Sequence, residues 1–135
     1  MQVLNYNLQD ELYYSKEHEW VRLEGKTAVV GITDYAQKQL HEIVYVEVQK
    51  GGSEVKQFQT IGTVESVKSV SDIFSPVTGK ITEVNTQLAE SPELLNQDPY
   101  GKGWIAKISL TDFKRDSQEL LTAKQYAELI KTLER

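Results

Sequence analysis

Lys68 is the residue whose type and setting best suit chemistry, because it lies at the centre of a stretch that is otherwise typical of a strand. The 15 residues from Thr60 to Phe74 are rich in Val, Ile, Ser and Thr, contain no Pro, and are about three times as long as a usual strand. Such a run has to fold back on itself. The sequence therefore predicts a hairpin with Lys68 at its tip, although the Asn-Gly or Asp-Gly pair typical of tight hairpins is missing.

A lysine at this position has two interpretations. It is either an ordinary solvated side chain on an exposed turn, or the target of a modifying enzyme. Modification needs an amine held out from a rigid scaffold, and here the paired strands fix its direction, the four-carbon stem gives reach, and the neighbours Ser66 and Ser69 are small. A tip without Gly also has fewer backbone conformations. The residues alone do not say which group is attached.

Other familiar chemistry finds little support in the sequence. The chain has no Cys, which excludes disulfides, thiol catalysis, iron-sulfur ligation and cysteine zinc sites. His18 and His41 lack ligand spacing, so we expect no metal site and interpret His18 as a hydrogen-bonded residue at the start of a strand. The stretch 101–106, GKGWIA, fits the dinucleotide fingerprint loosely, but it follows no strand and opens no helix. We predict no catalytic residue.

Length and charge limit the classes of function. The 135 residues fit one domain, which we place at 13–135, after a tail or short edge segment at 1–12. A net charge of -5 argues against nucleic acid as a partner and favours basic proteins. No apolar run approaches the roughly 18 residues of a membrane span, and the first residues show no targeting pattern. We expect a cytoplasmic protein, with a mature mitochondrial matrix protein as the alternative.

Short strands dominate the elements that must position Lys68. Gly and Pro separate these runs of β-forming residues, and Thr33 or Asp34 caps a short helix through Leu40. No βαβ repeat is present, so the pattern predicts a β-barrel or β-sandwich. Besides the hairpin, the predicted strands are 20–23, 27–32, 43–48, 80–85 and 104–110.

The C-terminal segment is predicted to be a helix packed outside the β structure. Its residues Tyr126, Leu129, Ile130 and Leu133 recur at helical spacing and form one apolar stripe. Two capping boxes are predicted at its start, one from Asp116 with Glu119 and one from Thr122 with Gln125.

Six ordered blocks between about Tyr13 and Leu133 resemble the H proteins of the glycine cleavage system, the small lipoyl carriers of that pathway. A single Val-Lys pair would not be specific, but six blocks in order are. The blocks are YSKEHEWVR (14–22), VGITDYAQ (30–37), VESVKSVSD (64–72), SPVTGKITEVN (75–85), ESPELLNQDPYGKGW (90–104) and ELLTAKQY (119–126).

The resemblance implies a mainly β barrel-sandwich hybrid of the lipoyl and biotinyl type, with short helices that include the C-terminal one. It also implies that lipoate is attached covalently to Lys68. Biotin carriers place Met on both sides of their lysine, and the lipoyl domains of 2-oxoacid dehydrogenases usually place Asp before it and Ala after it. Here the neighbours are Val67 and Ser69, which favours the H proteins.

The resemblance further implies a carrier, not an enzyme, and a set of partners. The arm would receive the aminomethyl group of glycine from a PLP-dependent glycine decarboxylase and give it up to a tetrahydrofolate-dependent aminomethyltransferase. Dihydrolipoyl dehydrogenase would reoxidise the arm, and a lipoyl or octanoyl transferase or a lipoate ligase would attach it. A carrier that visits several active sites is expected to be a monomer.

Three acids are expected to contact the loaded arm, folded back into a cleft that excludes water. By motif alignment these are Glu19, Asp72 and Glu17, and Glu17 stands where many relatives carry Ser. The alternative is that Glu19 and Asp72 merely cap a strand and a turn. Trp20 and Trp104 are expected in the core.

Two other functions remain open at this point. One is a relay that passes octanoyl or lipoyl groups to other lipoyl domains. The other is a β adaptor domain without a prosthetic group.

Overall fold

The protein is mainly β, as the sequence predicts, and the computed structural model describes every residue from Met1 to Arg135. All strand pairs are antiparallel, and two larger sheets and one small hairpin result. The larger sheet has the order β3 (Tyr13–Tyr14), β4 (Glu19–Glu24), β5 (Thr27–Ile32), β11 (Ala106–Leu110), β10 (Gly79–Val84), β7 (Glu54–Val55). The second sheet has the order β6 (Ile43–Val48), β8 (Thr60–Ser66), β9 (Val70–Phe74), and β1 (Gln2–Val3) pairs with β2 (Tyr6–Asn7).

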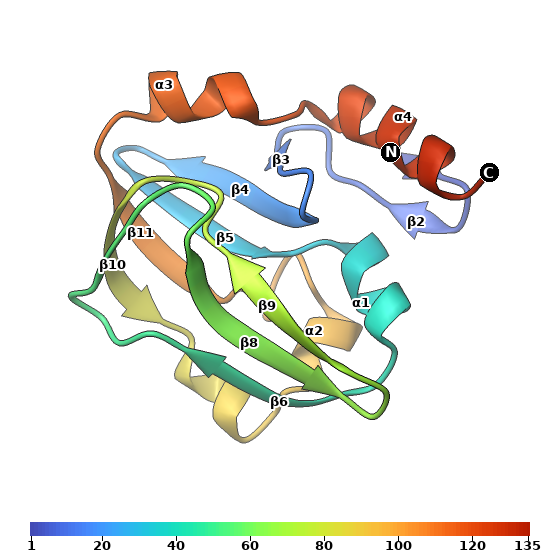
Figure 1. Cartoon of the computed structure of the whole chain (residues 1–135), viewed down its shortest axis with the longest axis horizontal. Coiled ribbons are helices and arrows are strands. Elements are labelled where there is room, and N and C mark those ends of the chain that lie inside the picture. Colours follow the sequence, from blue (N-terminus) through green and yellow to red (C-terminus); the bar gives the residue numbers. More distant parts are fainter.

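Helices are short and lie outside the sheets, with α3 and α4 along one side of the molecule (Figure 1). Thr33 caps α1, because its Oγ1 accepts the N–H of Ala36 at 3.1 Å. The predicted capping box of Thr122 and Gln125 is confirmed, and it starts α4. The helices are α1 (Asp34–Leu40), η1 (Thr86–Ala89), α2 (Leu94–Gln97), α3 (Phe113–Asp116), η2 (Ser117–Glu119) and α4 (Ala123–Leu133).

The second predicted capping box, from Asp116 to Glu119, is wrong. Asp116 is 1% exposed, and its carboxylate accepts the backbone N–H of Thr78 at 2.7 Å and the hydroxyl of Thr78 at 3.3 Å. It makes no side-chain cap to the η2 turn that follows. The carboxylate thus secures the turn between β9 and β10 against α3, a partner that lies 38 residues away in the sequence.

The main core lies between the two larger sheets. It contains 18 buried residues, among them Val21 of β4, Ile61 of β8 and Ile81 of β10. In Figure 1 the sheet of β6, β8 and β9, drawn in green, lies against the blue and orange strands of the larger sheet. The hairpin that carries Lys68 is therefore anchored by its inner side chains to a packed core.

A second apolar cluster of 12 buried residues lies where α4 and the N-terminal segment cover the larger sheet. Trp20, expected in the core, is fully buried in it, whereas Trp104 is only partly buried, with the Lys107 ammonium 5.2 Å from its ring centroid. Of the predicted C-terminal stripe, Tyr126 and Ile130 are fully buried and Leu133 is 48% exposed. The helix packs outside the sheets, as predicted.

Residues 1–12, expected as a tail or a short edge segment, fold as the β1–β2 hairpin and its flanks. Val3, Leu8 and Leu12 are at most 5% exposed and belong to the second cluster. The Tyr100 hydroxyl donates to the Asn7 carbonyl at 2.6 Å, which secures the segment. The segment is thus packed against the protein over much of its length.

Candidate functional site

The hairpin tip is held by Ser66 and does not need glycine. The Oγ of Ser66 accepts the backbone N–H groups of Lys68 at 3.2 Å and Ser69 at 3.1 Å, and the Ser66 N–H donates to the Ser69 carbonyl at 2.8 Å. No residue of the tip has a positive φ angle. A serine side chain can replace part of a backbone turn in this way, so the absence of Asn-Gly is explained.

A further bond ties the tip to the neighbouring strand. The Val67 N–H donates to the carbonyl of Glu42, immediately before β6, at 3.1 Å. The Lys68 side chain itself is exposed and takes part in no hydrogen bond or ion pair. The predicted hairpin with Lys68 at its tip is therefore confirmed, and its amine is uncommitted on a tip fixed by backbone and serine contacts.

Glu19 is a buried acid at the other end of β9. It is 2% exposed, and its carboxylate accepts the hydroxyl of Ser15 at 2.5 Å and the backbone N–H of Phe74 at 3.2 Å. No cation pairs with it. Burial raises its pKa to about 8, against partial opposition from these two hydrogen bonds.

Glu17 and Asp72 are exposed, and neither forms an ion pair. Glu17 lies in the turn before β4, close enough to Glu19 for its charge to raise the pKa of Glu19 further. Asp72 lies on β9 opposite Thr63 of β8. The structure thus places the predicted acids along β9 and beside its end, without a direct contact among them or with Lys68. Their role toward an arm stays a prediction.

A pocket of about 320 Å³ lies at this end of β9. Five residues line it, and we call it the Phe58–Phe74 pocket: Lys16, Glu17, Phe58, Phe74 and Glu119. Phe58 is 40% exposed and has a φ of 69°, a left-handed conformation that is rare for a bulky residue. Neither aromatic residue can be recognised as a site residue from the sequence, because the loop before β8 and the end of β9 meet only in the fold.

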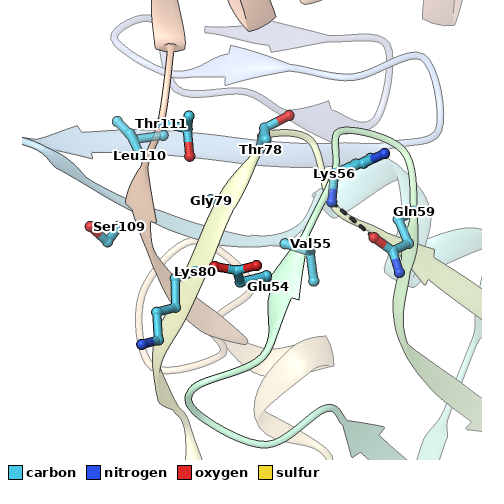
Figure 2. A pocket seen from close by; sticks show the side chains of 10 residues that line it. All are labelled: Glu54, Val55, Lys56, Gln59, Thr78, Gly79, Lys80, Ser109, Leu110 and Thr111. Carbon is cyan, nitrogen blue, oxygen red and sulfur yellow. Dashed lines mark hydrogen bonds between the residues drawn. The ribbon is translucent and has the colours of Figure 1, made fainter.

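A larger and more polar pocket, of about 500 Å³, lies over the paired strands β7, β10 and β11 (Figure 2). Gly79 lies in its middle, and the Lys56 N–H donates to the Gln59 side chain at its rim at 2.9 Å. Only two of its ten lining residues are hydrophobic. It includes none of the residues singled out by the sequence, so it does not help to define the site.

No group of three or more His, Cys, Asp or Glu residues is placed to hold a metal ion. His18 donates to or accepts from the Tyr126 hydroxyl at 2.8 Å, just before β4. None of the helices has both the length and the apolar character needed to cross a membrane.

Comparison with known proteins decides the family. The family model described as "Glycine cleavage H-protein" matches residues 12–133. The chain belongs to this family. It is 49% identical to proteins from Pyrococcus abyssi and Pyrococcus furiosus, each named "Probable glycine cleavage system H protein", over 134 residues. Each match covers 98% of this chain and 99% of the relative.

Solved structures agree with the family assignment. A crystal structure of a glycine cleavage system H protein from Mycobacterium marinum is similar to this chain with a TM-score of 0.80 and 33% identity. The match covers 90% of this chain and 98% of the other. The predicted membership and the predicted barrel-sandwich hybrid fold are therefore confirmed. Membership in the H-protein family implies a lipoyl carrier role.

Proposed function

We propose that this protein carries a lipoyl group on Lys68 and shuttles the aminomethyl group of glycine between the enzymes of glycine cleavage. The observation that carries the proposal is the uncommitted, exposed Lys68 side chain on a tip fixed by Ser66, in a chain of the H-protein family. The residues fit the group, because the amine is free to form an amide and its neighbours are small. We propose that the protein acts as a carrier and not as an enzyme, and we assign no catalytic residue to it.

The lipoyl group supplies a reversible dithiol and disulfide at the end of a flexible arm. The chain supplies the lysine stem, a rigid hairpin that presents it, and acids at the surface around β9. We propose that Glu17, Glu19 and Asp72 serve an arm with a cationic cargo. Glu19, with its raised pKa, is largely protonated at neutral pH, and a nearby cation would favour its ionised form.

The proposed partners are those of the pathway. They are a PLP-dependent glycine decarboxylase, a tetrahydrofolate-dependent aminomethyltransferase, dihydrolipoyl dehydrogenase, and an enzyme that attaches lipoyl or octanoyl groups. We propose a monomeric, cytoplasmic carrier, since one arm has to enter several active sites in turn.

Intact mass tests the attachment. Incubation of the protein with lipoate, ATP and a lipoate ligase should add the mass of one lipoyl group, and glycine with the decarboxylase should then raise the mass further. Lys68→Arg should abolish both additions, because a guanidinium stays charged and does not become an amide nitrogen.

Lys50→Arg is the matched control, since Lys50 is also an exposed lysine on a turn. It should take up the lipoyl group as the unaltered protein does. An unaltered protein that refuses the group under conditions where another lipoyl domain accepts it would contradict the proposal and favour the adaptor alternative. Modification that persists in Lys68→Arg would move the attachment to another lysine.

A further inference from the structure

We propose that Asn96 is a positioning residue for Lys68, because its side chain fixes the segment to which the hairpin tip is bonded. The inference rests on the proposed attachment at Lys68 and adds to it a residue of α2. Asn96 belongs to the block ESPELLNQDPYGKGW (90–104), which contains none of the acids proposed to serve the arm.

The tip is bonded to the segment that joins α1 to β6. One backbone bond leaves the hairpin there, from the Val67 N–H to the Glu42 carbonyl at 3.1 Å. Figure 1 shows this segment, where the chain passes from α1 into β6, beside the turn of the β8–β9 hairpin. Because Val67 directly precedes Lys68, the direction of the Glu42 carbonyl influences the direction in which the lysine leaves the protein.

Asn96 bonds the same peptide group as the tip does. The Glu42 carbonyl and the Ile43 N–H belong to one planar peptide unit and point in opposite directions. The Asn96 side-chain oxygen accepts the Ile43 N–H at 3.0 Å. The carbonyl at the other side of the unit accepts the N–H of Val67. A single rigid unit therefore connects Asn96 to the tip.

The backbone at His41 is strained, and Asn96 helps to hold it. His41 ends α1 with a φ of 66° and a ψ of -148°, a combination that is essentially confined to glycine. Such a conformation persists only where the surrounding contacts fix it. Here the His41 N–H donates to the Gln37 carbonyl at 2.9 Å, and the His41 carbonyl accepts the Asn96 amide at 2.8 Å. Asn96 thus holds the peptide groups on both sides of Glu42.

Gln37 and Asp34 fix the orientation of the Asn96 amide. Gln37 is 7% exposed, and its amide donates to the Asp34 carboxylate at 2.7 Å. Since a carboxylate only accepts, the Gln37 oxygen is left to face Asn96, whose amide donates to it at 3.0 Å. Both N–H groups of Asn96 are then engaged, on Gln37 and His41, and its oxygen faces Ile43. The side chain has one orientation in which every bond is made.

Asn96→Asp tests this role with little change in size. It replaces the two N–H donors by an acceptor that faces the oxygens of Gln37 and His41. We expect amide hydrogen exchange at Val67 to become about tenfold faster in the unlipoylated protein, because the acceptor of that N–H is no longer held. The Ser69 N–H, which Ser66 holds within the hairpin, should change much less. NMR-detected exchange measures both.

Lipoylation kinetics give the second measurement. A tip that samples more directions is less often in the one that the ligase accepts, and apparent affinity falls with that fraction. With lipoate, ATP and a lipoate ligase, Asn96→Asp should raise the KM for the protein about fivefold or more, as the loss of these bonds implies, and leave kcat nearly unchanged. Intact mass at several protein concentrations measures both constants. Asn96→Ala removes the same bonds without adding a charge and should show the same pattern.

Two controls separate positioning from other effects. Gln97→Glu makes the same change from amide to acid at the next residue of α2, which is exposed, and it should alter neither Val67 exchange nor the KM. Ile130→Ala weakens the second apolar cluster, where Ile130 is fully buried. It should lower the free energy of unfolding and leave both measurements unchanged.

The outcomes distinguish Asn96 from the attachment. Val67 exchange and a KM equal to those of the unaltered protein, in both Asn96 variants, would overturn the positioning role and leave the carrier role standing. Equal changes in Ile130→Ala would also overturn it, since they would reflect a general loss of stability. An unaltered protein that accepts no lipoyl group would overturn the carrier role, while exchange at Val67 would still test the contact of Asn96 with the tip.

Discussion

Glu19 is a buried carboxyl without a cationic partner, and this makes the stability of the protein depend on pH. Its pKa is raised from 4.5 to about 8 in the folded state by burial. Between these two values the folded protein keeps a proton that the unfolded chain has lost. Stability that is present below pH 4.5 is therefore lost as the pH rises toward 8.

Glu19→Gln should remove this dependence. We expect the free energy of unfolding of the unaltered protein, relative to the Gln variant, to fall by a few kcal/mol from pH 5 to pH 8, since one pKa unit corresponds to about 1.4 kcal/mol. Urea unfolding at several pH values measures both proteins. A constant difference across this range would show that Glu19 is ionised throughout.

His18 acts in the opposite direction and is present in both proteins of that comparison. Burial lowers its pKa, so the unfolded chain takes up a proton below about pH 6.5 that the folded protein refuses. Stability due to His18 therefore falls as the pH decreases through that range. Subtracting the two pH profiles cancels this contribution and isolates Glu19.

At the residue scale, the position of Lys68 at a hairpin tip could be predicted from the sequence, but the burial and contacts of the acids could not. Lys68 is central in a long strand-like run, which is a local pattern. The buried carboxylate of Glu19 accepts the backbone N–H of Phe74, 55 residues away, and no local pattern contains that contact. Ser66 was noticed only for its small size, although its hydroxyl on two backbone N–H groups follows a known turn motif.

At the scale of elements, the hairpin of β8 and β9 is the part that the function depends on. Its tip is held by the Ser66 side chain at the end of β8 and by one bond beyond the hairpin, from Val67 to Glu42. Its inner residues Val64 and Ile73 are at most 2% exposed in the main core. The tip therefore owes its order to a small number of hydrogen bonds, and the strands owe theirs to packing.

Ser66→Ala should loosen the tip and leave the strands intact. We expect amide hydrogen exchange at Lys68 and Ser69 to become roughly tenfold faster, and the free energy of unfolding to fall by only about 1 kcal/mol. Lipoylation at a fixed ligase concentration should slow. NMR-detected exchange and intact mass measure these effects.

Ser71→Ala is the control on the same hairpin, because the Ser71 hydroxyl bonds only the adjacent Asp72 carbonyl, at 3.5 Å. If both variants exchange alike at the tip, Ser66 does not hold it.

Helices and strands were the part of the fold that could be predicted best from the sequence. The strands Thr27–Ile32 and Ile43–Val48 and the helix from Asp34 to Leu40 agree at both ends with the prediction, since alternation and capping are local signals. The last predicted strand instead begins at Ala106. The carbonyl of Trp104 is bound by the side-chain amide of Asn85 at 2.8 Å, a contact that the sequence does not reveal.

At the scale of the whole molecule, two apolar clusters hold different parts of the fold together. The main core holds the two larger sheets together, and the second cluster joins α4 and the N-terminal segment to the larger sheet. The sequence predicted a tail at 1–12 because that stretch is polar and aperiodic. Its three buried residues are spaced irregularly, so they match neither the helix nor the strand pattern and could not be recognised as buried from the sequence.

Leu8→Ala tests whether the N-terminal segment belongs to the cooperative fold. Leu8 is 2% exposed, so its truncation should lower the free energy of unfolding by about 2 to 4 kcal/mol. Leu4→Ala, at a 56% exposed position of the same segment, should change it by no more than about 0.5 kcal/mol. Chemical denaturation followed by circular dichroism measures both. Near-zero effects from both variants would support the boundary at residue 13.

The two chain ends lie close together beside α4, at the top of the view, where the Tyr6 hydroxyl donates to Glu134 at 2.5 Å, while the β8–β9 hairpin turns on the lower side of the view (Figure 1). An affinity handle, a fluorophore or a surface linker fused at either end would therefore emerge away from the lysine. When the protein is immobilised through such a fusion, the face that carries Lys68 should point toward the solution. Partner enzymes can then be captured on the immobilised protein.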